Sequence, residues 1–188
     1  MRNLLVAASA AALAISAVAA CGPASAFQTI IGGMAGQCST AAKAGRFDQA
    51  ALELCTMAIL TEPLDPHDRA GTLVNRGAMK LRNRDWSSAN ADFDAALKLF
   101  PQMGEAHIGR GAYLISQERY AAAEPELTQG IQLGSEEPEK GYYFRGIARW
   151  GQDDFKGAYF DFRKANALKP GWSLPLEQLA YFKVTPAG

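Results

Sequence analysis

The sequence predicts an all-α protein, an α-α superhelix in which about four helix-turn-helix repeats stack side by side and a C-terminal helix caps the stack. One observation is a pattern of 27 residues that recurs from Asn75, Gly109 and Phe144, so that the period is 34 and then 35 residues. Another is that small and large apolar residues hold the same places in each copy. Periods of this length are typical of solenoids built from helical hairpins.

The repeated positions explain how two helices could pack closely. The shared small residues are Gly77, Gly111 and Gly146, then Ala89, Ala123 and Ala158, then Ala96, Gly130 and Ala165. The shared large ones are Trp86, Tyr120 and Phe155, then Phe93, Leu127 and Phe162. Helices approach closely where side chains are small, so we expect the glycine of each first helix to face the alanine of the second. Pro101 and Pro170 end two of the copies, because proline cannot continue a helix.

These positions together resemble the tetratricopeptide repeat, a helix-turn-helix unit that stacks into a solenoid. The resemblance extends from about Ile31 to Val184. We predict a first, divergent repeat at residues 27–66, and further repeats at 67–102, 103–137 and 138–171. A capping helix and tail follow at 172–188, where Leu176, Leu179 and Phe182 have helical spacing within 173–184.

The first repeat departs from the pattern. Its first helix is expected at about residues 31–44, and Phe47 lies one residue off its expected place, so the turn between the two helices is expected to be altered by one residue. Asp65 and Pro66 supply an N-cap and a first-turn proline for the next helix, which is therefore expected to begin a turn early. Pro125 lies inside a predicted second helix and removes one backbone donor, so we expect a kink or looser first turns there.

The N-terminal 26 residues are predicted to be a secretory signal peptide. Arg2 precedes an uncharged run from Leu4 to Ala20, and Ala24-Ser25-Ala26 fits a cleavage site. The alternative is lipidation at Cys21, because Val18-Ala19-Ala20-Cys21 resembles a bacterial lipobox. We therefore expect an exported, periplasmic protein, or otherwise a membrane-anchored lipoprotein. A membrane association is expected only if Cys21 is lipidated.

Cys38 and Cys55 are the thiols that remain after either cleavage. An even number of cysteines in an exported protein favours a disulfide. A metal site and a redox pair are the alternatives, but further ligands are not near in sequence, and a redox pair more often has the Cys-x-x-Cys spacing. We predict a structural disulfide, which stabilises by roughly 3 kcal/mol in the chain-entropy model.

An arginine precedes each repeated glycine and has an acidic residue 16 positions later. The pairs are Arg76 and Asp92, Arg110 and Glu126, and Arg145 and Asp161. Arginine binds a carboxylate through two parallel hydrogen bonds, so each pair suits a contact across one hairpin. A row of arginines that binds an anionic ligand is the alternative, but a ligand site would not need the same pair in every repeat.

The resemblance implies a ligand groove along the concave surface, which the first helices form. The matching positions include Ala78, Gly109 and Ala112, and the tentative peptide-binding residues are Val74, Asn75, Arg82, Ile108, Ile115, Tyr143, Phe144, Ile147 and Trp150. This groove would be mostly apolar and would suit an extended or helical peptide. For Tyr143 and Trp150 the alternative is packing beneath the capping helix.

Composition and motifs argue against other classes of function. Nineteen basic and nineteen acidic side chains leave no net charge, so the composition does not indicate a basic surface that binds nucleic acid. We find no phosphate loop, nucleophile elbow or cluster of metal ligands, so we expect no enzyme, no cofactor and no metal. We therefore predict an exported scaffold or adaptor that binds a protein or peptide. A lipid-anchored structural subunit of an envelope complex and an enzyme on a helical scaffold are the alternatives.

Overall fold

The computed structural model describes residues 33–182, and nine helices lie within this range. They are α1 (Met34–Lys43), α2 (Gln49–Thr61), α3 (Pro66–Arg82), α4 (Trp86–Leu99), α5 (Gly104–Ser116), α6 (Tyr120–Leu133), α7 (Pro138–Trp150), α8 (Phe155–Leu168) and α9 (Ser173–Leu179). No strand occurs among these residues, so the predicted all-α architecture is confirmed. The predicted signal peptide and Cys21 lie outside the described residues.

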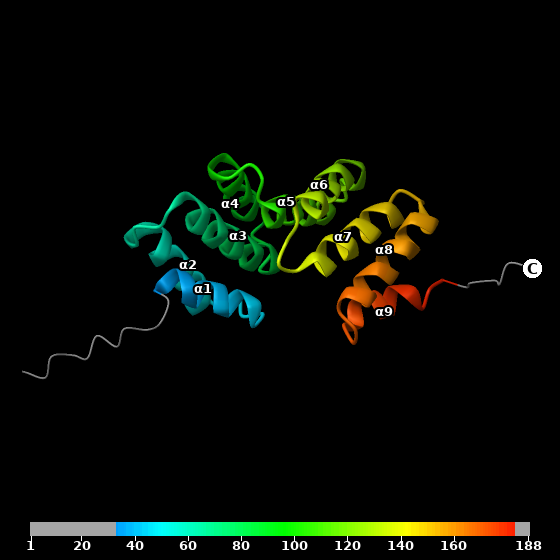
Figure 1. Ribbon diagram of the computed structural model, residues 1–188, viewed down its shortest axis with the longest axis horizontal. Helices are drawn as coiled ribbons and strands as arrows, with labels where there is room; N and C mark the ends of the chain where they lie inside the picture. Colours follow the sequence, from blue (N-terminus) through cyan, green and yellow to red (C-terminus); the bar gives the residue numbers. More distant parts are fainter. Residues whose placement is uncertain (1–32, 183–188) are drawn as a thin grey trace, which may run out of the picture.

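Consecutive helices pair into four antiparallel hairpins, which we number 1 to 4: α1–α2, α3–α4, α5–α6 and α7–α8. Figure 1 shows that the hairpins follow one another in an arch, with α4 and α6 along its outer edge and α9 after the last hairpin. Each hairpin contacts the next, since α2 packs on α3, α4 on α5 and α6 on α7. The helices thus form the predicted solenoid, while the exact repeat boundaries stay a prediction.

Aspartate caps start four of the helices. The carboxylates of Asp48, Asp65, Asp85 and Asp154 each accept a hydrogen bond from a backbone N–H in the first turn of α2, α3, α4 and α8. Such a cap satisfies one of the N–H groups that a helix start leaves without a partner. The early start of α3 at Pro66, which the Asp65-Pro66 pair predicted, is confirmed.

The turns inside the hairpins repeat as well. Arg84, Glu118 and Asp153 have positive φ angles of 62°, 56° and 62°, and each stands one residue before the N-cap of a second helix. Hairpin 1 differs, because its positive-φ residue is Gly45 and the N-cap Asp48 follows three residues later. The altered turn expected near Phe47 is therefore confirmed, as a longer loop over residues 44–48.

The close contact inside each hairpin is between glycine and a ring or a leucine, which differs from our expectation. A Cβ added to Gly77 would lie 2.8 Å from the Phe93 ring, and one added to Gly146 would lie 2.6 Å from the Phe162 ring. At Gly111 the same atom would lie 2.5 Å from Cγ of Leu127. The expected pairing of glycine with alanine was therefore wrong. The absent side chain of glycine makes room for the largest core residue of the opposite helix.

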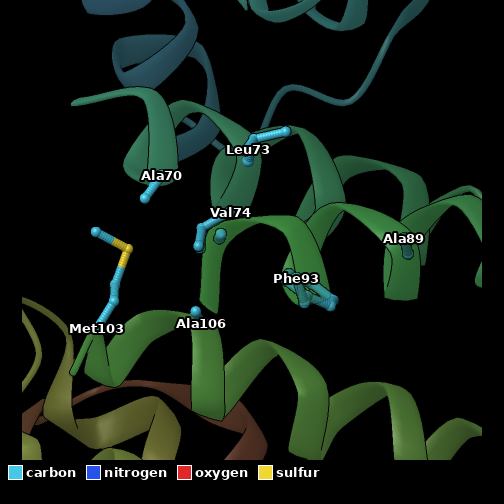
Figure 2. Packing of buried hydrophobic residues seen from close by; sticks show 8 residues of the cluster. Ala70, Leu73, Val74, Ala89, Phe93, Met103 and Ala106 are labelled. Atoms are coloured by element: carbon cyan, nitrogen blue, oxygen red, sulfur yellow. The ribbon is translucent and has the colours of Figure 1, made fainter. Parts of the chain in front are cut away.

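The core runs through the stack as a series of apolar clusters, of which three are shared between neighbouring hairpins and the last joins hairpin 4 to the C-terminal segment. Figure 2 shows one, in which side chains of α3, α4 and the start of α5 meet around Val74 and Phe93. Phe93 is fully buried because it lies between two glycines, Gly77 of its own hairpin and Gly109 of the next. The contact with Gly109 is one reason why hairpins 2 and 3 stack closely.

The C-terminal cap is shorter than predicted. Helix α9 ends at Leu179, and residues 183 and 184 lie outside the described range. Leu179 and Phe182 are half-buried against hairpin 4, whereas Leu176 is 45% exposed and does not serve as a covering residue. The buried residue of α9 is instead Pro175.

Helix α6 continues through Pro125 without interruption. Its start has no side-chain cap, and the first-turn amides of Ala122 and Ala123 both bond to the carbonyl of Arg119. Within residues 33–182, no helix combines the length and the apolar character that crossing a membrane requires.

Candidate functional site

The predicted groove residues divide by burial, and three of them belong to the core. Val74, Ile108 and Tyr143 occupy equivalent positions on α3, α5 and α7, and each is at least nine-tenths buried. The reason is that this position points toward the next element of the stack, which is the next hairpin for Val74 and Ile108 and the C-terminal segment for Tyr143. Val74 packs in the cluster that includes Met103, and Ile108 packs with Leu127. These three side chains therefore pack each hairpin against the element that follows it, and they offer little surface to a ligand.

The other predicted groove residues are accessible. Asn75, Ile115, Phe144, Ile147 and Trp150 are half-buried. Arg82 is exposed, and its guanidinium carbon lies 4.5 Å from the ring centroid of Phe47 in the first hairpin. The first helices therefore carry a line of half-covered apolar groups that ends in exposed polar side chains. Ala78 is exposed and Ala112 is buried.

Trp150 and Tyr143 contact the C-terminal segment. The ring centroid of Trp150 lies 5.0 Å from that of Phe182 and 5.7 Å from that of Phe155. The ring centroid of Tyr143 lies 4.9 Å from that of Trp172. Aromatic pairs at these separations stabilise beyond the area that they bury. Both residues therefore pack near the C-terminal cap, as the alternative interpretation predicted. Of the two, only Trp150 keeps part of its surface accessible to solvent.

The three arginine–carboxylate pairs form across the hairpins. Arg76 binds Asp92 through two hydrogen bonds of 2.9 and 2.7 Å, and Arg145 binds Asp161 in the same way at 2.9 and 2.8 Å. Arg110 donates one hydrogen bond of 2.6 Å to Glu126. The side chains of Asp92 and Asp161 are almost fully buried. The hydrogen bonds that Arg145 donates to Asp161 raise the pKa of Arg145 above its ordinary value, so this guanidinium stays charged.

A second basic or imidazole side chain contacts each carboxylate, which the sequence analysis did not anticipate. Nζ of Lys80 lies 2.8 Å from Asp92, and Arg149 lies 2.9 Å from Asp161. Both are four residues after the first arginine, so they lie on the same side of their helix. In hairpin 3 the second group is His107, three residues before Arg110, with Nδ1 2.9 Å from Glu126. The shared interval from Lys80 to Asp92 and from Arg149 to Asp161 could have revealed this pattern in hairpins 2 and 4.

His107 is buried, and both ring nitrogens face oxygen atoms. Nδ1 contacts the Glu126 carboxylate and Nε2 contacts the carbonyl of Pro101 at 3.0 Å. Burial alone would raise the pKa of Glu126, but the hydrogen bonds from Arg110 and His107 outweigh it, and the net pKa lies below its ordinary value. Glu126 is therefore ionised at neutral pH and holds α5 to α6.

Each arginine also reaches the preceding hairpin. Its Nη1 atom lies 3.3 Å from the Thr56 hydroxyl for Arg76, and 3.3 Å from the Thr128 hydroxyl for Arg145. Arg110 contacts Asp94 at 3.5 Å. The three acceptors occupy equivalent positions on α2, α4 and α6. The arginines thus join successive hairpins as well as the two helices of one hairpin, and their donors are directed at protein acceptors rather than at a groove.

Cys38 and Cys55 form the predicted disulfide, with their Cα atoms 4.9 Å apart. Both are fully buried. Cys38 occupies the place of the repeated glycine, and Cys55 occupies the place of Phe93, Leu127 and Phe162. The disulfide therefore stands where the glycine-to-ring contact stands in the other hairpins.

One group of possible metal ligands lies on the surface. Asp65, His67 and Asp68 have ligand atoms within 4.8 Å of one another, and all three are exposed. The Asp65 carboxylate already accepts the N-cap hydrogen bond from the amide of Asp68 at 2.9 Å. This use in capping explains the cluster without an ion.

Comparison with known proteins identifies the fold. No family model and no curated protein matches the sequence. Among solved structures, MamA 41-end from Desulfovibrio magneticus RS-1 is similar at 23% identity over 80% of this chain and 84% of that chain, with a TM-score of 0.56. The Arabidopsis OM64 TPR domain is similar at 22% identity over 61% of this chain and 94% of that one, also with a TM-score of 0.56. At these identities the likeness shows the fold alone, and the chain has the tetratricopeptide-repeat fold.

Proposed function

We propose that the protein is an exported scaffold that binds a protein or peptide partner along the inner surface of its arch. The observation that supports this proposal is the line of half-buried apolar side chains on the first helices, Ile115, Phe144 and Ile147, with Asn75 beside it. A half-covered apolar side chain gains when a partner completes its burial, and the amide of Asn75 can bond to a peptide backbone. The core positions Val74, Ile108 and Tyr143 are not part of this binding surface.

Export is supported by the oxidised cysteine pair. Disulfides form and persist in oxidising compartments and are rare in the cytosol of mesophiles. The cleavage site after Ala26 is the proposed route to a periplasmic protein, and Cys21 is the proposed lipid-attachment site in the alternative. Incorporation of labelled palmitate into the wild type but not into a Cys21→Ser variant would establish the anchored form.

Site-specific crosslinking tests the groove. A photo-reactive amino acid placed at Ile147, in the groove, is expected to capture a discrete partner in envelope fractions. The same group at Leu60, which is 72% exposed on α2, is the control. A groove double variant, Phe144→Ala with Ile147→Ala, is expected to release the partner while the circular-dichroism spectrum stays helical. Equal capture from both positions, or a partner that the double variant still holds, would overturn the proposal.

A further inference from the structure

The exposed face of α8 carries a cluster of cations around an exposed aromatic ring. Lys156, Phe160, Arg163 and Lys164 fall on one side of the helix, because successive members are four, three and one residues apart. All four side chains are exposed, and the ring of Phe160 is 54% exposed. We call these four residues the α8 basic face. No part of the groove proposed above contributes to it.

The three cations lack acidic partners. Within residues 33–182, no carboxylate lies at ion-pair distance from Lys156, Arg163 or Lys164, although the neighbouring Arg145, Arg149 and Lys169 are all paired. Asp161, the only acidic residue within α8, is buried, and its carboxylate is bonded to Arg145 and Arg149 of α7. The positive charge of the basic face is therefore not neutralised locally.

Aromatic rings lie beneath two of the cations. The guanidinium carbon of Arg163 lies 5.7 Å from the ring centroid of Tyr159, and Nζ of Lys164 lies 6.0 Å from that of Tyr142. Contacts of this kind restrict a long side chain without neutralising its charge. They lower the conformational entropy that a partner would have to remove on binding.

The repeat framework does not require this face. The equivalent residues are Ser87, Ala91, Asp94 and Ala95 on α4, and Ala121, Pro125, Thr128 and Gln129 on α6. Arg163 is equivalent to Thr56, Asp94 and Thr128, the acceptors for the arginine of the next hairpin. Helix α9 provides no such arginine. The position of Arg163 therefore does not have to accept a hydrogen bond from a following element, and it holds a cation in place of an acceptor.

We propose that the α8 basic face binds an acidic protein segment that places an apolar side chain against Phe160. Charges of opposite sign on a partner would complement the three cations, and an apolar centre with a polar rim is the usual anatomy of a protein interface. The face spans about 12 Å along the helix, at 1.5 Å per residue, which suits a segment of a few residues. A flat anionic membrane fits less well, because it would also lie against the exposed Asp153 and Asp154 in the turn next to Lys156, whereas a short segment along α8 need not reach them.

Fluorescence anisotropy with two labelled probes tests the proposal on the oxidised mature protein. One probe is a synthetic peptide of glutamate and leucine, and the other replaces each glutamate by glutamine. The acidic peptide is expected to bind at least about tenfold more tightly, with an affinity that falls as salt rises. The triple variant K156E/R163E/K164E is expected to lose this difference. Phe160→Ala is expected to weaken binding of the acidic peptide and to keep the salt dependence.

The matched control reverses three other exposed cations, with the same change in net charge. It carries R84E, K98E and R119E, and these residues are exposed and belong to hairpins 2 and 3. Glu118 already occupies the position equivalent to Arg84, so the exchange suits that turn. Retention of acidic-peptide binding by this control supports the proposal, and loss equal to that of the α8 triple variant overturns it.

Two further results would also overturn the proposal. One is equal affinity for both peptides. The other is binding to phosphatidylglycerol vesicles, abolished by the α8 triple variant, without binding to the acidic peptide, because the face would then recognise a membrane. The groove variant F144A/I147A is expected to bind the acidic peptide like the wild type, so failure of the groove proposal is distinguished from failure of this one.

Discussion

Hairpin 1 and the other three hairpins solve the same packing problem by different means. In hairpins 2 to 4 a glycine on the first helix receives a large side chain from the second, and an arginine–carboxylate pair lies beside that contact. Hairpin 1 has Gln37 and Leu54 at the positions of that pair, and it has the Cys38–Cys55 disulfide at the position of the glycine contact. In hairpin 1 a buried covalent bond therefore stands where the other hairpins have only a packing contact.

The largest expected effect is the loss of the ring in hairpin 2. Phe93→Ala leaves a cavity between Gly77 and Gly109, and we expect the free energy of unfolding to fall by about 3–5 kcal/mol in a urea titration. The control is Phe160→Ala, because that ring is 54% exposed, and its expected change is within about 0.5 kcal/mol. Equal losses of unfolding free energy in the two variants would contradict the conclusion that Phe93 stabilises the stack by filling the space between Gly77 and Gly109.

Removal of the disulfide is expected to have a slightly smaller and more local effect. A Cys38→Ser, Cys55→Ser double variant should lose roughly 3 kcal/mol in the chain-entropy model, mainly from hairpin 1. Hydrogen exchange should therefore accelerate in α1 and α2 and remain slow in α7 and α8, because the end of a solenoid can open locally. Uniform acceleration along the chain would show that the disulfide stabilises the whole stack instead.

A methyl group at the glycine contact sharpens the comparison. Gly77→Ala places Cβ 2.8 Å from the Phe93 ring, which Gly109 confines on its other side, so we expect a loss of about 1–3 kcal/mol from overpacking. The control lies in the same helix. A Cβ on Gly71 meets nothing within 4 Å, so Gly71→Ala is expected to stabilise by up to about 1 kcal/mol through helix propensity. Thermal unfolding of the two variants should move in opposite directions.

The smallest expected effect is the pH dependence of hairpin 3. The pKa of Glu126 is lowered in the folded protein, so its contribution is complete above its unfolded pKa, near 4.5, and is lost as the pH falls through the lower folded pKa. A Glu126→Gln variant should therefore be less stable than the wild type at neutral pH, and the difference should shrink in acid. A difference that stays constant from pH 7 to pH 3 would contradict this assignment.

Much of the fold could be predicted from local sequence. The 34-residue period located the hairpins, Asp65 and Pro66 placed the start of α3, and the shift of Phe47 indicated the altered turn. The interval of 16 residues between arginine and carboxylate identified all three pairs, because the two helices of one hairpin meet at a fixed register. Such features depend on one helix or one hairpin, so a repeated pattern in the chain is enough to reveal them.

The candidate site was predicted less completely. Positions on the first helices were assigned to the inner surface as a group, yet Val74, Ile108 and Tyr143 are buried and Ile147 is accessible. The second side chains on these carboxylates, Lys80, His107 and Arg149, were not foreseen, since hairpin 3 uses a different offset from the other two. The partner of glycine was also mistaken, because size alone does not say which residue of the facing helix is opposite.

The sequence by itself determined the helices, their pairing, the disulfide and the charge pairs within hairpins, since these follow from helical periodicity, capping chemistry and repetition. Only the tertiary structure decided which side chains the next hairpin covers. That depends on the offset between stacked hairpins, which places Phe93 against Gly109 and joins Arg145 to Thr128. It also depends on where the stack ends, which leaves Arg163 and Lys164 without acidic partners in the described chain.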